Sequence, residues 1–247
     1  MKKKFDFNTV FNAFILVGMT VAIVLATAIR LGRGDESPVL LIVAAFGSLT
    51  GILGTVCSAN GIIWNFLFGA VNVAIYSAMC FVGAKYGNAL LHLLYFLPMQ
   101  FIGFAQWRRR GASGKEGLKA RRLSLKGRVI AGSAFVLGSA ALFLLLRISG
   151  AGITPLADAV SVVCNIIGQL LLSTAYMEQW FFWIGVNVAS IVMWSLTLVA
   201  SPGDSYALIY IIKYSFYLVN SLNGLRIWIE RSRRVPGKAV PGQGLEM

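Results

Sequence analysis

The feature that most constrains this chain is a series of apolar runs, each as long as a bilayer-spanning helix. About 20 apolar residues cross the hydrocarbon core as a helix. The runs are continuously apolar rather than alternating, which argues against barrel strands. Only 13% of the residues are charged, against about 25% in soluble domains. The sequence therefore predicts an all-α membrane protein with eight transmembrane helices, at residues 9–31, 38–58, 60–84, 87–107, 129–147, 155–176, 179–200 and 206–229.

The net charge of +13 falls mostly on one side of these predicted helices. Lysine and arginine are concentrated before the first helix, in the segment 108–128 and after residue 230. With an even number of spans these three segments share one face, and the positive-inside rule places that face and both termini in the cytoplasm. We therefore interpret the charge as an orientation signal and as a contact for anionic lipid headgroups. No nucleic-acid partner is expected.

Loop length and charge divide the chain into six segments. These are an extra N-terminal helix, a first group of three helices, a basic loop, a linker helix, a second group of three helices, and a tail. Their predicted bounds are 1–34, 38–107, 108–128, 129–150, 154–230 and 231–247.

The two groups of three helices share short motifs in the same order. Val71 to Ala74 of the first group is repeated as Val186 to Ala189 in the second, and both read Val-Asn-Val-Ala. The third helices end alike, on Gly103-x3-Trp107 and Gly224-x3-Trp228, and each tryptophan precedes an arginine cluster. One helix separates the groups, so both insert with the same orientation. The sequence therefore predicts two parallel repeats in a 3-1-3 arrangement.

Inside the predicted spans the polar side chains are amides and hydroxyls rather than acids. Unsatisfied polar groups are costly in hydrocarbon, so these should face the bundle interior or a cavity. Asn72 and Asn187 each follow an aromatic residue, Phe68 or Trp183, by four positions, so amide and ring share a helix face. This pairing suits the recognition of a flat polar ring. The alternative is that the asparagines only bridge helices.

The last predicted helix carries tyrosines at helical spacing. Tyr210, Tyr214 and Tyr217 share a face that Asn220 extends. Aromatic faces can hold a delocalised cation without a carboxylate. Alternatively, the tyrosines bond to neighbouring helices or lie in the interfacial belt. Lys213 is the one cation well inside a span, and it either extends to the near surface or lines the pathway.

Catalytic and metal-binding sets cannot be assembled from these residues. The chain has one histidine, His92, and its three cysteines lack paired spacing. We therefore expect a transporter of a small solute, not an enzyme, and no cofactor or metal. No carboxylate lies near the predicted midplane, which disfavours proton coupling; sodium coupling stays open.

Several of these motifs, in this order, resemble the PnuC family of bacterial nicotinamide riboside (vitamin B3) transporters. The resemblance covers residues 40–230 and is carried by Trp64-Asn65-Phe66-Leu67-Phe68-Gly69 with Asn72, Tyr95 to Pro98, Gly103-x3-Trp107, and Trp183-x3-Asn187 followed by Tyr214 to Trp228. It implies a SWEET-like fold and a homotrimer in the bacterial inner membrane. It also implies facilitated diffusion of nicotinamide riboside by alternating access, with cytoplasmic phosphorylation driving uptake.

The substrate implied by this resemblance agrees with the polar residues. Its pyridinium, carboxamide and ribose hydroxyls suit aromatic faces and amides, whereas a mononucleotide would call for arginines. Another flat cationic vitamin such as thiamine, or a non-transporting membrane scaffold or sensor, stays open. The predicted substrate-binding residues are Asn72, Gln100, Trp183, Asn187, Tyr214 and Asn220, with Phe68, Tyr210 and Tyr217 beside them.

Overall fold

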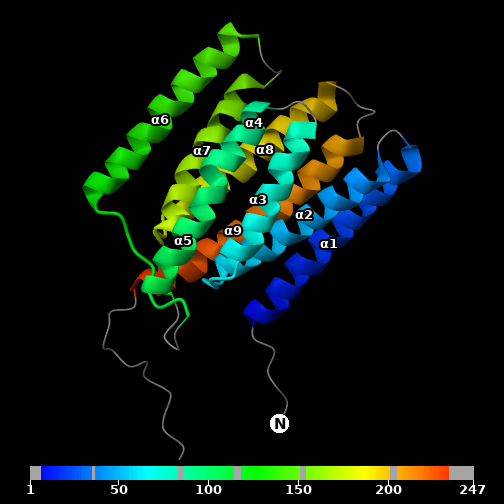
Figure 1. Cartoon of the computed structure of the whole chain (residues 1–247). Helices are drawn as coiled ribbons and strands as arrows, with labels where there is room; N and C mark the ends of the chain where they lie inside the picture. The colour runs from blue at the N-terminus through cyan, green and yellow to red at the C-terminus, as the bar shows by residue number, and fades with distance from the viewer. Residues whose placement is uncertain are drawn as a thin grey trace, which may run out of the picture.

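The chain is almost entirely helical over the residues that its computed structural model describes, which are 7–34, 37–82, 86–113, 118–150, 154–200 and 205–233 (Figure 1). The helices are α1 (Phe7–Arg33), α2 (Pro38–Ala59), α3 (Asn65–Val82), α4 (Tyr86–Leu91), the π-helical turn η1 (His92–Phe96), α5 (Leu97–Arg109), α6 (Leu125–Ile148), α7 (Pro155–Ser173), α8 (Gln179–Ala200) and α9 (Ser205–Arg233). The elements α4, η1 and α5 follow one another without a break and form one long helical segment.

Seven helical segments of the described residues are long and apolar enough to cross a membrane. They are α1, α2, α3, the α4 to α5 segment, α6, α7 and α8. The eighth predicted span is present as α9, which has 29 residues. Its lysine, tyrosines and asparagines make it less apolar than the others, although at about 1.5 Å per residue it is long enough to cross. The predicted all-α membrane fold is confirmed.

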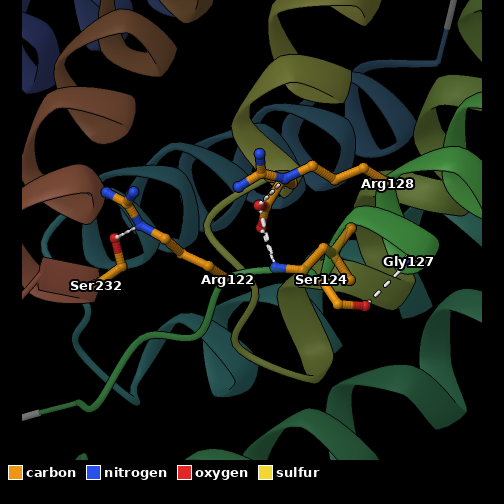
Figure 2. Close-up of polar contacts among 7 residues, drawn as sticks. Arg122, Ser124, Gly127, Arg128 and Ser232 are labelled. Carbon is orange, nitrogen blue, oxygen red and sulfur yellow. Dashed lines mark hydrogen bonds and ion pairs between the residues drawn. The ribbon is translucent and has the colours of Figure 1, made fainter.

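Three of the predicted helix ends are wrong by several residues. The helix expected from residue 60 begins at Asn65, because Gly61 takes the left-handed φ of 65° and ends the previous helix. The helix expected to end at 176 ends at Ser173, and Ala175 has a φ of 61°. The linker helix starts before residue 129, because Ser124 caps it by accepting a hydrogen bond from the Gly127 N–H at 3.2 Å (Figure 2).

The helices form one bundle with α6 on its outside (Figure 1). The helix α8 packs between α7 and α9, and α2 packs against α3, while α6 packs against α7 and α1 packs against α2 and α9. The two predicted groups meet where α2 packs against α9 and where α5 packs against α7. Each group therefore contacts the other through its first and its third helix.

Two buried tryptophans make reciprocal hydrogen bonds across this boundary. The Nε1 of Trp107 on α5 donates to the carbonyl oxygen of Leu172 on α7 at 2.8 Å. The Nε1 of Trp228 on α9 donates to the carbonyl oxygen of Ser58 on α2 at 3.1 Å. In both cases the accepting carbonyl lies three residues before the residue with left-handed backbone. Two copies of a duplicated three-helix unit would be expected to make such equivalent bonds to each other. The repeat itself stays a prediction.

A glycine one turn before each tryptophan lets an aromatic ring approach the helix. A Cβ at Gly103 would lie 2.1 Å from Phe66 Cε1, and one at Gly224 would lie 2.5 Å from Trp180 Cη2. Both distances are far shorter than a carbon–carbon contact. Glycine is therefore needed at both positions for the rings to pack as they do.

The rings belong to a hydrophobic cluster, here termed the tryptophan cluster, at one end of the bundle. Leu118, which follows α5, is 3% exposed and packs among residues from both predicted groups. The buried members are Ala59, Ile63, Phe66, Trp107, Leu118, Leu172, Ala175, Met177, Trp180, Ile227 and Trp228. The cluster fills the end of the bundle at which α5 and α9 finish.

The segment between α5 and α6 lies against the turn that joins α7 to α8. The Arg121 N–H donates to the Ala175 carbonyl at 2.8 Å, and the Arg121 carbonyl accepts from the Met177 N–H at 2.9 Å. The Arg121 guanidinium lies 4.3 Å from the ring centre of Tyr176. The predicted basic loop is thus partly docked onto the second group of helices.

Glu178 anchors the same segment at the start of α6. Both of its carboxylate oxygens accept from the Leu123 N–H at 3.1 Å, and Oε1 lies 3.3 Å from Nε of Arg128 (Figure 2). Next to it, Nε of Arg122 donates to the hydroxyl of Ser232 on α9 at 2.9 Å (Figure 2). The α5–α6 segment is therefore tied to the turn before α8 and to α9.

Replacing Glu178 with glutamine is expected to lower the melting temperature of the purified protein by about 2–4 °C, which corresponds to about 1 kcal/mol. The glutamine keeps one acceptor for the Leu123 N–H but loses the charge that faces Arg128. The side chain of Glu178 is 6% exposed, so water does not replace the lost interaction. Arg128 is 52% exposed, which keeps the expected effect small.

Glu230→Gln is the matched control, because Glu230 is 61% exposed and lies 3.8 Å from Arg226. Such exposed pairs contribute little. The melting temperature of Glu230→Gln should stay within about 1 °C of the parent. Equal shifts in the two variants would show that Glu178 does not anchor the segment.

Candidate functional site

A cavity of about 310 Å³, here termed the central cavity, is lined by all six helices of the two predicted groups. Its volume lies at the lower end of the range for small-molecule sites. It adjoins the tryptophan cluster, since Leu172 and Trp180 contribute to both. Of the nine predicted substrate-binding residues, those that line it are Asn72, Gln100, Trp183, Asn187, Tyr214 and Tyr217.

The other three predicted residues lie elsewhere. Tyr210 lines a second cavity and stacks on Trp194, with ring centres 4.1 Å apart. Asn220 is fully buried and its Nδ2 donates to the Thr55 carbonyl of α2 at 3.4 Å. Phe68 is half-buried and lines neither cavity. The amide of Asn220 therefore joins two helices in this conformation.

Asn187 and Trp183 lie one turn apart on α8, and both are held by neighbouring side chains. The Asn187 amide, which is 5% exposed, donates to the hydroxyl of Ser221 on α9 at 3.0 Å. The Trp183 indole N–H donates to Oε1 of Gln179 at 3.3 Å. A Cβ at Gly168 would lie 3.3 Å from the indole ring, so the absence of a side chain there lets α7 approach the ring.

Asn72 and Gln100 are positioned in the same way on the first group of helices. The Asn72 amide donates to the Gly47 carbonyl of α2 at 2.7 Å. The Gln100 amide donates to the Phe96 carbonyl at 3.2 Å. A Cβ at Gly69 would lie 2.4 Å from Gln100 Oε1, so glycine is required at this position for the glutamine to lie against α3.

A π-helical turn brings two further residues to the cavity. Pro98 has no N–H to continue the α-helical ladder, and the turn at His92–Phe96 precedes it, with the Leu97 N–H donating to the His92 carbonyl. The turn places His92 and Phe96 in the cavity wall. It also directs the Tyr95 hydroxyl to the Ile166 carbonyl of α7 at 2.6 Å.

Sequence reasoning did not assign three other amides that line the cavity. Asn165 and Gln169 lie one turn apart on α7, and their amides donate to the Ser161 carbonyl at 2.8 Å and to the Ser173 hydroxyl at 3.3 Å. Asn65 begins α3, and its Oδ1 is buried without a hydrogen-bond partner. Their residue type and the four-residue spacing of the α7 pair were the available signals.

The lining amides are engaged through their nitrogen atoms rather than through their oxygen atoms. Five of the six donate to a neighbouring carbonyl or hydroxyl, as given above, and no described group donates to the side-chain oxygen of any of the six. Among the described residues that line the cavity there is also no lysine, arginine, aspartate or glutamate. The six are Asn65, Asn72, Gln100, Asn165, Gln169 and Asn187. These oxygens are free to accept hydrogen bonds, so this wall is suited to a ligand that donates hydrogen bonds or carries positive charge.

A second cavity of about 360 Å³ lies between α1, α2, α3 and α9. It is nearer the opposite end of the bundle, since its lining includes Arg30 late in α1 and Leu41 early in α2. Lys213 and Tyr210 of α9 also line it, and Asn72 lines both cavities. The two cavities therefore meet at the level of Asn72.

The comparisons with known proteins agree on one family. The model of the family described as nicotinamide mononucleotide transporter matches residues 41–230. The chain is 34% identical over 199 residues to a nicotinamide riboside transporter PnuC from Neisseria mucosa, covering 79% of this chain and 74% of that protein. It is 31% identical over 193 residues to the PnuC of Haemophilus influenzae, covering 77% of this chain and 80% of that protein.

A solved structure is also similar. A crystal structure of the vitamin B3 transporter PnuC superimposes with a TM-score of 0.67 and 30% identity, covering 90% of this chain and 92% of that one. The residues that the family model matches include every residue that lines the central cavity. The first helix, α1, lies outside the matched residues.

Proposed function

We propose that this chain, which belongs to the nicotinamide mononucleotide transporter family, carries nicotinamide riboside across the membrane through the central cavity. The observation that carries this proposal is a wall of six amides whose side-chain oxygens accept no hydrogen bond from the described residues, with no charged side chain in the described lining. Nicotinamide riboside has a positive ring, a carboxamide N–H₂ and ribose hydroxyls, so it supplies what those oxygens lack. Two relatives that are over 30% identical carry the same substrate in their names.

The lining residues divide between two roles in this proposal. Trp183 and Tyr214 stack on the pyridinium, since aromatic faces attract a delocalised cation. Asn72, Gln100 and Asn187 accept hydrogen bonds from the carboxamide and the ribose. A phosphate would need arginine or lysine in the wall, and the described lining has neither. The riboside is therefore favoured over the mononucleotide.

The proposed mechanism is facilitated diffusion by alternating access. The tryptophan cluster closes one end of the bundle, and the second cavity lies toward the other. Rocking of the two groups of helices would expose the central cavity to each side in turn. The described lining of the central cavity holds no carboxylate, and its one histidine, His92, has Nδ1 bonded to the Asn88 carbonyl at 2.8 Å, so proton coupling is disfavoured. Phosphorylation of the riboside in the cytoplasm would then drive net uptake.

The proposed setting is the bacterial inner membrane, with both termini cytoplasmic and three copies in the assembly. Arg108 and Arg109 end α5 and Arg231 and Arg233 end α9, so the end with the tryptophan cluster is the basic one. Anionic headgroups would contact this end. Side-specific labelling of single cysteines checks the orientation, and native mass measurement checks the trimer.

Proteoliposomes test the proposed function. Labelled nicotinamide riboside should enter until the inner and outer concentrations are equal, and a proton or sodium gradient should not change that end point. A ribosylnicotinamide kinase with ATP trapped inside should convert equilibration into accumulation. Unlabelled riboside should compete, whereas its mononucleotide and thiamine should not.

Three other outcomes of this experiment would each contradict one part of the proposal. Competition by thiamine alone would move the chain to a different vitamin. Accumulation driven by an ion gradient would contradict facilitated diffusion. The absence of any flux, in protein that is correctly folded and inserted, would favour a membrane scaffold or sensor.

A further inference from the structure

Lys213 lies where the central cavity and the second cavity approach each other. It lies in the first half of α9, and its side chain lines the second cavity. Its Nζ lies 5.5 Å, 5.6 Å and 5.7 Å from the ring centres of Tyr210, Tyr214 and Tyr217. Tyr214 and Tyr217 line the central cavity. A positive charge therefore lies against the rings that form one wall of the central cavity.

The three rings are the interaction that the structure offers to this charge. Among the described residues no carboxylate forms an ion pair with Lys213. Cations within about 6 Å of an aromatic ring centre are attracted by its quadrupole, and more strongly where water is excluded. The ammonium thus occupies an aromatic cage formed by Tyr210, Tyr214 and Tyr217, here termed the tyrosine cage.

Two of these rings, Tyr214 and Tyr217, are also available to a cationic substrate in the central cavity. If Tyr214 stacks on the pyridinium, as in the proposed function, the ammonium and the substrate compete for one electron-rich surface, and they also repel each other. The lysine stem has four methylene groups and rotates freely, and the second cavity gives the ammonium a space beside the cage. The ammonium can therefore withdraw without a backbone change.

We propose that Lys213 sets the affinity for the cationic substrate by acting as a tethered competitor in the tyrosine cage. The ammonium holds the cage when the site is empty, and the pyridinium displaces it on binding. The affinity for the substrate is lowered in consequence, and the substrate is released faster after it has crossed the membrane. Lys213 is thus a residue that determines specificity for charge rather than a ligand of the substrate. This inference rests on the proposed function.

The test compares the parent with Lys213→Met, which keeps a long unbranched side chain but removes its charge. Each protein is titrated calorimetrically with nicotinamide riboside and with its reduced dihydro form, whose ring is uncharged. We expect Lys213→Met to bind the riboside about tenfold more tightly. The uncharged form should bind both proteins equally. In proteoliposomes the variant should show a lower KM together with a lower maximal rate.

Two further variants complete the design. Lys213→Arg keeps the charge and its attraction to aromatic rings, so its affinity should stay close to that of the parent. Lys213→Gln removes the charge with a different side chain, and it should show the same tightening as Lys213→Met. It also replaces Lys213→Met in the comparison if that variant does not fold.

The outcomes separate this inference from the proposed function. If the parent binds no riboside, both are overturned. If the parent binds it and the uncharged variants do not bind it more tightly, or also bind the dihydro form more tightly, only the role of Lys213 is overturned. If the parent binds the mononucleotide and the uncharged variants lose it, Lys213 is a phosphate ligand, and the competitor role is again overturned.

Discussion

Asn187→Leu is expected to lower the affinity for nicotinamide riboside by at least about a hundredfold while the protein still inserts and folds. The amide lies in the wall of the central cavity, and its donor is already engaged by Ser221 at 3.0 Å. Its oxygen is therefore the group left for the substrate. Leucine has the same branched shape but offers no acceptor, so a buried donor of the substrate would lose its partner. Calorimetric titration and riboside flux measure the loss.

Thr197→Val provides the matched control on the same helix. The Thr197 hydroxyl donates to the Met193 carbonyl within α8 at 3.0 Å, and the residue lines neither cavity. Its removal should leave riboside affinity unchanged within about twofold. An unchanged affinity of Asn187→Leu for nicotinamide riboside would contradict the assignment of Asn187 to the substrate-binding site. A similar loss in both variants would point to a general effect on α8.

Gly103→Ala is expected to lower the melting temperature by about 5–10 °C, in line with the cost of forcing an extra methyl into a packed core. The added Cβ would lie 2.1 Å from Cε1 of the Phe66 ring. That ring is 1% exposed and meets Trp107 edge to face, with centres 4.9 Å apart. A rigid ring held on both sides cannot turn away, so the helices themselves must separate.

Gly132→Ala is the control for this change, because a Cβ at Gly132 on α6 would meet no atom within 4 Å. Alanine is the better helix former, so that variant should keep or slightly raise the melting temperature. Both proteins can be compared by thermal unfolding in the same detergent. A small and equal effect of the two substitutions would show that the contact of Phe66 with α5 is not tightly packed.

Much of the fold could be predicted because span length and apolarity are properties of the sequence itself. The helix ends could not, because they depend on single residues. Ala175 takes a left-handed backbone that residues other than glycine seldom adopt. An alanine at this position therefore does not indicate that α7 has ended. The cap at Ser124 was similarly hidden among the basic residues of the loop.

The residue types that line the central cavity could be predicted from the sequence, whereas the particular residues could be predicted only in part. Helical spacing correctly placed Asn187 with Trp183, since both lie on one face of one helix. It also joined Asn220 to the tyrosines, but that amide is turned to the Thr55 carbonyl of a different helix. Helical spacing shows which residues share a face, but the helix that packs against this face is determined by the tertiary structure. The shared orientation of the amides also depends on tertiary structure, because each is fixed by the carbonyl or hydroxyl that accepts from it.

The reciprocal bonds of Trp107 and Trp228 impose a condition on any movement at the basic end of the bundle. Moving α5 away from α7 breaks one bond, and moving α9 away from α2 breaks the other. Both bonds cross the boundary between the two groups of helices, and each group supplies the donor of one and the acceptor of the other. The proposed alternating access, if it separates the two groups of helices at this end, would therefore have to break both bonds.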